Sequence, residues 1–552
     1  MLDTDAFLCL NEGMSSDGLP TLPKVPKVSD LPPDQITPLV VTLLEIIHRQ
    51  QEQLQQLRDE VARLKGEKPK PKIRPSALEK PPRSGKEGGR PKERHKRHKT
   101  RELTIHETVK LAPAEIPAGS RFKGYEDFTV QDIRIELHNT RFRLERWETP
   151  SGERLVGPLP DELSGRHFGP TILAYILHQY HHAHVTEPLL LEQLREWGVD
   201  ISAGQLSAVI TEDKEAFHAE KEELLRVGLQ ESEYIHVDDT GARHQGKNGY
   251  CTHIGNERFA YFASTHSKSR INFLGLLRAG RDGYVLNDDA LAYMAAQKLP
   301  GGPLARLAGH EQKTLDCEEE WQATLTELGI TTPRHVRIAT EGALLGCVLD
   351  NGSMRDLVIV SDDAGQFDVL LHALCWVHAE RLLVRLVGFN DAQREALEKV
   401  RTEIWEIYAG LKAYKVAPDE TQKAQIEARF DTLCATKTCF TSLNLALKRM
   451  HSNKAELLLV LERPSTPLQN NLSERDIREY VKKRKISGST RSDEGRRCRD
   501  TFASLKKTCR KHEISFWDYL NDRVRGASQI PRLAEWLRRR ASTDNPPLQV
   551  PT

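Results

Sequence analysis

Apolar residues recur in a heptad pattern near the start of the chain. Polar Gln50 fills the one missing step of a 3-4-3-4 spacing, whose apolar members are Val40, Leu43, Ile47, Leu54, Leu57, Val61 and Leu64. Over about three and a half heptads this spacing predicts a short coiled-coil helix, at residues 36–66, that pairs subunits. The alternative is an amphipathic helix that packs on its own domain.

Beyond residue 104 the apolar period changes from seven residues to two. Side chains alternate between apolar and polar from Phe128 to Val156, as in Phe142-Arg-Leu-Glu-Arg-Trp147. A period of two is that of strands, so a small β-rich module is expected at residues 104–160.

A helical period follows this module. Pro170 to Tyr180 predicts one helix, and Leu189 to Trp197, Gly198 and Ser202 to Ile210 have the order helix, glycine turn, helix. We expect a helix-turn-helix-like unit at residues 161–230, either as a DNA-reading element or as a plain packing unit. Histidines stand at positions 178, 181, 182 and 184, but no carboxylate or cysteine pattern joins them, so no metal is expected there.

Short strands then bring carboxylates to their ends. The β-branched run Tyr234 to Thr240 ends on Asp238 and Asp239, and two more strands are predicted at 249–254 and 258–264. A second apolar run, Leu357 to Ser361, stops at Asp362 and Asp363. In an RNase H-like fold the first and fourth strands lie side by side and each carries a metal-binding Asp. The predicted fold class is therefore α/β, an RNase H-like mixed sheet flanked by helices, at residues 231–515.

The third acid, Glu474, lies in helical sequence after a break at Pro464 and Pro467. Three carboxylates from distant segments suit two Mg²⁺ (or Mn²⁺) ions about 4 Å apart, which need hard oxygen ligands and open positions for phosphate and water. One ion lowers the pKa of the attacking hydroxyl or water and the other stabilises the leaving oxygen. Helical sequence at 391–451 is interpreted as an exposed insertion, and amphipathic basic helices are expected from Phe516 to Arg540, followed by a tail to residue 552.

Composition and charge bear on the domain count and on a DNA partner. At 552 residues the chain exceeds the size of one core, so several domains are expected. The net charge is +1, yet residues 66–101 hold 14 Lys and Arg against 4 Glu. This stretch is interpreted as a basic disordered linker, at residues 67–103 after a disordered segment at 1–35, that either binds DNA phosphates or is only a solvated tether. Its expected phosphate contacts are Lys92, Arg94, Lys96, Arg97 and Lys99.

Nine cysteines occur singly, without a framework spacing, so free thiols in a reducing cytosol are expected. No run approaches about 20 apolar residues, and the first residues lack the order of a signal peptide. These features predict a cytoplasmic protein with no membrane partner.

Four sequence blocks occur in an order that resembles the IS66 family of bacterial insertion-sequence transposases. They are His236-Val-Asp-Asp-Thr240, Ser361-Asp-Asp-Ala-Gly-Gln-Phe367, Cys375-Trp-Val-His-Ala-Glu-Arg381 and Asn470-Asn-Leu-Ser-Glu474. The likeness implies a DDE polynucleotidyl transferase whose triad is Asp238, Asp362 and Glu474. It further implies cleavage at the ends of a mobile element, transfer of the 3′-hydroxyl ends into target DNA, and a place in the bacterial cytosol with the nucleoid.

Two departures from the family pattern bear on cofactor and site. The family usually carries a cysteine-rich zinc module before the catalytic domain, yet residues 104–159 contain no cysteine, so zinc is not expected. The stretch from Leu286 to Leu357 is longer than usual and contains a rival second acid, Asp288 or Asp289. Asp362 is preferred because Cys375 and His378 follow it closely.

The residues around the triad are assigned supporting roles. Asp239 and Asp363 should point away from the chosen acids, because neighbours on a strand face opposite sides. Cys375 and His378 have a spacing that can bind zinc, but they are interpreted as part of a packed helix. Thr240, Asn470 and Asn471 complete the supporting set. The cations expected to contact cleaved-strand phosphates are Arg478, Lys483, Arg484, Lys485 and Arg491.

Two other functions are consistent with the same residues. A DNA-binding regulator would keep the fold without cutting, and a nuclease of this fold would cut without joining.

Overall fold

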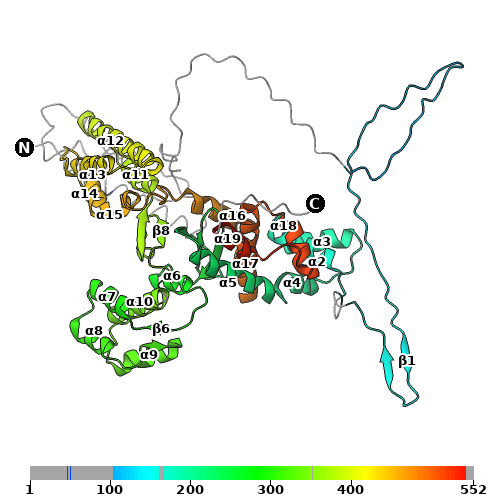
Figure 1. The fold of residues 1–552 in the computed structure, drawn as a ribbon, viewed down its shortest axis with the longest axis horizontal. Helices are drawn as coiled ribbons and strands as arrows, with labels where there is room; N and C mark the ends of the chain where they lie inside the picture. Colours follow the sequence, from blue (N-terminus) through cyan, green and yellow to red (C-terminus); the bar gives the residue numbers. More distant parts are fainter. Residues whose placement is uncertain are drawn as a thin grey trace, which may run out of the picture.

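The computed structural model describes residues 47, 50, 104–160, 163, 167–350, 352 and 354–541. The heptad seam, apart from two of its positions, and the basic linker with its five expected phosphate contacts lie outside these residues. The described chain is an α/β protein with helices around one mixed sheet (Figure 1).

The central sheet has five strands in the order β5-β4-β3-β8-β9. Strands β3 (Tyr234–Gly241), β4 (Tyr250–Gly255) and β5 (Ala260–Thr265) pair antiparallel, whereas β8 (Val358–Ser361) and β9 (Leu371–Leu374) continue parallel to β3. The strands expected at 234–240, 249–254, 258–264 and 357–362 are thus confirmed to within about two residues.

The two faces of the sheet differ in chemistry. One face buries Ile235, Val237 and Ile359 in the largest core, with α5 (Glu215–Gln230), α6 (Arg270–Leu277), α10 (Pro333–Leu349) and α17 (Asp493–Lys511). The other face carries α16 (Asn471–Ser487), where Phe262 stacks on Tyr480. Residues His236 and Asp238 belong to this second face, because side chains alternate along a strand.

The long stretch between the two acid-bearing strands forms a helical subdomain. It contains β6 (Tyr284–Val285), α7 (Asp288–Ala296), α8 (Gly301–Ala308), β7 (Thr314–Leu315) and α9 (Glu318–Glu327), and ends in α10. Strands β6 and β7 pair antiparallel, and Tyr284 stacks on the fully buried Trp321 with ring centroids 5.2 Å apart. Figure 1 places this subdomain at one side of the sheet, below β8.

The second insertion differs from its predicted character. Helices α11 (Trp376–Val384), α12 (Asp391–Val416), α13 (Glu420–Ala435), α14 (Thr441–Ser452) and α15 (Lys454–Leu457), with the 3-10 turn η6 (Leu459–Leu461), surround a separate core. The fully buried Trp376 contributes to this core. The charged residues on the outer faces suggested an exposed scaffold, but an apolar stripe on α12, with Ile404, Ile407 and Leu411, closes the core.

The segment before the sheet agrees only in part with expectation. Helices α2 (Pro170–His181), α3 (Glu187–Glu196) and α4 (Ala203–Thr211) confirm the three predicted helices, and Ser202 with Gln205 forms a capping box before α4. The β-rich module is reduced to one hairpin, β1 (Arg146–Glu148) and β2 (Arg154–Val156). Residues 128–137, the first part of the alternating stretch, form no strand, because alternation alone provides no partner strand.

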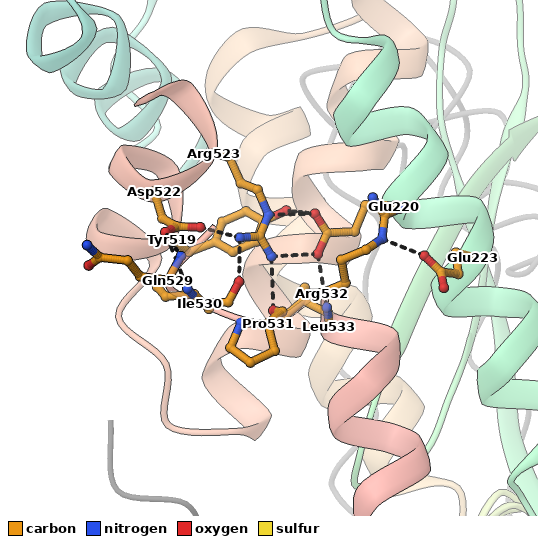
Figure 2. A network of polar contacts seen from close by, with 10 residues as sticks. All are labelled: Glu220, Glu223, Tyr519, Asp522, Arg523, Gln529, Ile530, Pro531, Arg532 and Leu533. Carbon is orange, nitrogen blue, oxygen red and sulfur yellow. Dashed lines mark hydrogen bonds and ion pairs between the residues drawn. The ribbon is translucent and has the colours of Figure 1, made fainter. Parts of the chain in front are cut away.

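A buried polar network joins the C-terminal helices to the core (Figure 2). Arg523 of α18 (Phe516–Arg525) donates to Glu220 of α5 through Nε at 2.9 Å and Nη2 at 3.0 Å. Tyr519 Oη donates to the same carboxylate at 2.9 Å, and the backbone N–H of Leu533, at the start of α19 (Leu533–Ala541), donates at 2.9 Å. Glu220 therefore fixes both C-terminal helices.

Glu220→Gln is expected to lower the free energy of unfolding by about 3 kcal/mol, since it removes the buried negative charge that Arg523 contacts through two guanidinium nitrogens. Glu223 makes the matched control because its pairs with Arg532 and Arg538 are half-exposed, and Glu223→Gln should cost below about 1 kcal/mol. If urea unfolding showed the same loss of unfolding free energy in the two variants, this role of Glu220 would be contradicted.

Two further expectations concern the described residues. The eight cysteines among them are all free thiols, as predicted. No helix in the described ranges is both long enough and apolar enough to cross a bilayer.

Candidate active site

Asp238 on β3 and Asp362 just after β8 lie at the same level of neighbouring strands. The parallel ladder of β3 and β8 pairs His236 with Val360, and each acid follows two residues later in the chain. Because residues two apart share a face, both carboxylates belong to the face that α16 covers. The strand ends therefore converge on one position.

Asn470 fixes the start of α16 on this face. Its Nδ2 donates to the carbonyl of Val237 at 2.7 Å, and its Oδ1 lies 2.9 Å from His236 Nδ1. Its backbone N–H donates to the Cys375 sulfur at 3.1 Å. One buried side chain thus links the residue before Asp238 to the helical turn that carries Glu474.

A second buried group fixes the same turn. His253 of β4 pairs directly with Asp238, and its Nδ1 lies 2.7 Å from Ser473 Oγ. Its Nε2 lies 3.3 Å from Asp476 Oδ2, and that carboxylate also contacts Lys511 Nζ at 2.7 Å. Burial opposes ionisation of Asp476, but His253 and the lysines hold its pKa well below the usual range. The ion pairs and hydrogen bonds hold α16 against the sheet.

Burial and the nearby acids both affect the pKa of Asp238. Burial, together with the nearby charges of Asp362, Asp239 and Glu474, raises the pKa of Asp238 to about 7, although the hydrogen bond from the Asp239 N–H acts in the opposite direction. A site of this kind disfavours its own ionised state unless a cation is bound.

The donors present fit a divalent ion. Asp362 Oδ1 is buried without a hydrogen-bond partner, and carboxylate oxygens are the ligands that Mg²⁺ and Mn²⁺ prefer. Within the described residues no three His, Cys, Asp or Glu side chains are yet close enough to hold an ion. Glu474 Oε1 instead contacts Arg381 Nη1 at 3.2 Å and His378 Nε2 at 3.4 Å. Glu474 Oε1 is thus engaged by two side chains of α11.

The acids that follow the first two have their own partners. Asp239 accepts from Thr252 Oγ1 at 2.5 Å and from Gln366 Nε2 at 2.9 Å, which ties β3 and β4 to the loop after β8. Asp363 pairs with Arg449 of α14 at 2.5 Å. Both acids are thus engaged by neighbouring side chains, and their supporting roles stay a prediction.

The remaining supporting residues lie around the same loop. Cys375 is buried at the start of α11, and burial raises its thiol pKa to about 11, so this sulfur is a hydrogen-bond acceptor in the core. Asn471 donates from Nδ2 to Gln469 at 3.0 Å, while its Oδ1 is buried without a partner. Thr240 Oγ1 accepts from Arg484 Nη1 at 3.3 Å.

The rival acids occupy a different part of the fold. Asp288 and Asp289 begin α7, where Asn287 caps the helix, and α7 packs on α10 and α8. Asp289 pairs with Arg355 at 2.5 Å. Neither acid lies on a strand of the central sheet, whereas Asp362 follows the strand that pairs with β3.

The basic residues on α16 and just after it divide into two groups. Arg478, Lys485 and Arg491 are exposed, and Arg484 also reaches the carbonyl of Gly241. Lys483 differs from its predicted role: it is buried, donates to the Tyr180 carbonyl at 2.7 Å and lies over the Tyr180 ring. Burial, with the charges of Arg499 and Lys506, lowers the Lys483 pKa to about 7. This lysine caps the end of α2 and is not available to a phosphate.

Sequence reasoning did not single out Arg381, His253 or Gln366 as site residues. Arg381 and Gln366 lie inside the blocks that define the family resemblance, three residues after His378 and four after Asp362, so their positions offered a signal. His253 offered only its place on a strand predicted next to Asp238. Its pairing depends on the strand register.

Comparison with known proteins agrees with this arrangement. The model of the "Transposase IS66 family" matches residues 165–305 and 358–497, segments that contain all three acids of the candidate site. The unmatched residues 306–357 lie within the helical subdomain between β6 and β8. An uncharacterised protein, y4jO, from Sinorhizobium fredii (strain NBRC 101917 / NGR234) is 43% identical over 303 residues, which cover 54% of this chain and 94% of the relative.

Proposed function

The chain belongs to the IS66 family of transposases, and from this premise we propose that Asp238, Asp362 and Glu474 form the metal-binding triad with which it cuts and joins DNA. The observation that carries the proposal is geometric: Asp238 and Asp362 follow paired positions of the parallel strands β3 and β8. Asn470, which bonds to Val237 and His236, holds the turn that bears Glu474 against β3, and this supports a common site for the three acids.

The fold supports the same assignment. The order β5-β4-β3-β8-β9, with the first three strands antiparallel and the last two parallel to β3, supports an RNase H-like sheet as part of this proposal. In that fold, acids at the ends of the two central parallel strands and on a covering helix form one site. A fold alone does not determine a reaction, so the proposal depends on the residues at that place.

The chemistry assigned to the chain is in-line attack on a phosphodiester. Two divalent ions held by the triad would supply charge stabilisation for the attacking and leaving oxygens. The protein's own part is to orient the acids through Asn470 and His253 and to release Glu474 from Arg381. Hydrolysis at the element end and attack by the freed 3′-hydroxyl on target DNA can then share one site, without a covalent protein–DNA intermediate.

DNA binding is assigned to the exposed cations near the triad. Arg478, Lys485 and Arg491 lie on α16 or just after it, and they suit contacts to backbone phosphates. The basic linker at residues 67–103 would add affinity without sequence choice. Two element ends must be held together, so we also assign subunit pairing to the heptad helix. A chain lacking residues 1–65 should no longer pair. Its molecular mass in solution should therefore fall by more than the mass of the deleted residues.

The test uses the full chain, Mg²⁺ and labelled DNA taken from both flanks of its gene, where the proposal expects inverted repeats. Cleaved 3′ ends and products joined to target DNA are expected. Cleavage without joining would indicate a nuclease of the same fold, and binding without cleavage would indicate a regulator. Either outcome would overturn the transposition chemistry.

His253 is expected to act as a positioning residue. His253→Asn keeps a donor near Ser473 but loses the contact with Asp476, and it should slow cleavage about 10- to 100-fold with unchanged affinity for the DNA end. His451 of α14, a half-exposed histidine that pairs with Asp431, provides the matched control, and His451→Asn should cleave normally. Equal cleavage rates for wild type and His253→Asn would show that α16 is positioned without this histidine.

A further inference from the structure

A cavity of about 300 Å³ lies beside the hairpin that joins β3 to β4. Its lining includes Arg243, Lys247, Ser264, Tyr480, Arg496 and Arg499. It is separate from the triad, because none of the three acids contributes to its wall. It is formed by the hairpin on one side and by α16, α17 and the loop between them on the other.

The walls of this cavity are fixed by hydrogen bonds. The backbone N–H of Gln245 donates to the Thr490 carbonyl at 2.8 Å, and the N–H of Thr490 donates to the Arg243 carbonyl at 3.2 Å. His244 Nδ1 lies 2.8 Å from Thr490 Oγ1. Buried Arg499 donates to the Gly488 carbonyl at 3.1 Å. The hairpin is therefore docked on the loop after α16, and the cavity is preformed.

The cavity is electropositive. Arg243, Lys247, Arg496 and Arg499 face a single acid, Asp493, which leaves three excess positive charges with neutral histidines. Asp493 is already engaged by Arg496 at 2.8 Å and by His244 at 3.2 Å. Lys247 is exposed at the mouth, and Arg243 holds the turn through the Gly246 carbonyl at 2.9 Å. An anion is the ligand that this lining favours.

The cavity lies close to the proposed cleavage point. Tyr480 follows Glu474 by six residues on α16, a rise of about 9 Å along the helix axis. Successive phosphates of one DNA strand are about 3.4 Å apart along a duplex. A strand whose scissile phosphate is at the triad therefore reaches the cavity within about three or four nucleotides.

We propose that the cavity binds one nucleotide of the DNA strand beside the cleavage point, turned out of the duplex. Its phosphate lies at the mouth, on Arg243 and Lys247, and its base enters the hollow lined by Tyr480 and Ser264. The volume supports a nucleotide because about 300 Å³ is the lower range of small-molecule pockets and far exceeds a phosphate alone. This inference rests on the proposed function, since it takes the strand at the triad as its source of the nucleotide.

The test measures binding of 2-aminopurine deoxynucleoside 5′-monophosphate to the full chain by fluorescence anisotropy. The double variant Arg243→Glu with Lys247→Glu is expected to bind at least about tenfold more weakly. The matched control is Arg226→Glu with Arg337→Glu, two exposed arginines on α5 and α10, which should bind as the wild type does. Asn248→Trp, which narrows the mouth without changing charge, should also weaken binding.

Three results would overturn the proposal. They are equal binding by the double variant and its control, undiminished binding by Asn248→Trp, and competition by inorganic phosphate as strong as that by the unlabelled nucleotide. Failure of the proposed function is distinguishable, because Asp238→Asn, expected to stop cleavage, should bind this nucleotide as tightly as the wild type. Thermal unfolding of each variant checks that the chain is folded.

Discussion

DNA cleavage by the Asp238→Asn variant is expected to be at least about 10³-fold slower than cleavage by the wild-type chain, with DNA-end binding retained. Asparagine keeps the shape of the side chain but removes the negative charge that would hold a divalent ion. Gel analysis of labelled end DNA measures both quantities. The matched control is Asp239→Asn, because Asp239 accepts hydrogen bonds from Thr252 and Gln366 and its loss should slow cleavage far less.

Although Asp238→Asn should lose activity, it is expected to gain stability at high pH. The Asp238 pKa is raised from 3.8 to about 7 in the folded chain, so the contribution of this group to stability is complete below about pH 4 and is lost as the pH rises through 7. Without metal at pH 8, Asp238→Asn is therefore expected to be more stable than the wild type by about 2 kcal/mol. The difference should shrink at pH 5. A variant that cleaves normally, or that is destabilised at pH 8, would contradict the role given to Asp238.

Asp362→Asn is expected to abolish cleavage as completely as Asp238→Asn, by about 10³-fold or more, whereas Asp289→Asn should cleave at nearly the wild-type rate. Asp362 follows the strand that pairs with β3, and its buried Oδ1 has no partner. Asp289 is ion-paired with Arg355 at the start of α7. The pair of variants separates the two possible second acids in one assay.

The opposite pattern, with activity lost in Asp289→Asn and kept in Asp362→Asn, would show that the second acid is Asp289 of the helical subdomain. Loss of activity in both would need the unfolding curves, because breaking the Asp289–Arg355 pair should cost at most about 1 kcal/mol at this exposed position. A folded, inactive Asp289→Asn variant would also contradict the assignment.

The strands that carry the acids were predictable because each is a short apolar run that ends at a polar pair. Val358 to Ser361 is buried on both faces, as its unbroken apolar pattern indicated. The positions of Asn470 and Glu474 followed from the family resemblance. The sequence did not predict which residues meet across the sheet. The pairing of His253 with Asp238 depends on the register between two strands, and the sequence of each strand alone does not fix that register.

Two errors have a common physical cause. Lys483 was assigned to DNA because it stands in a basic run, yet it lies on the helix face that packs against Tyr180. The insertion with α12 was taken as an exposed scaffold because its sequence is rich in Glu, Lys and Arg, yet the stripe containing Ile404 is buried. In both segments, composition described the whole helix, whereas packing depends on which residues share a face.

The central claim is that Asp238, Asp362 and Glu474 hold divalent ions at one place, and cleavage of the protein backbone by bound Fe²⁺ tests it without any DNA. Fe²⁺ substituted for Mg²⁺ in the full chain, with ascorbate and peroxide, generates hydroxyl radicals that cut the nearest backbone. The account predicts three cuts, near residues 238, 362 and 474, that excess Mg²⁺ suppresses and Asp238→Asn removes. Cuts concentrated elsewhere, at α7 or at the histidines of α2, would contradict it.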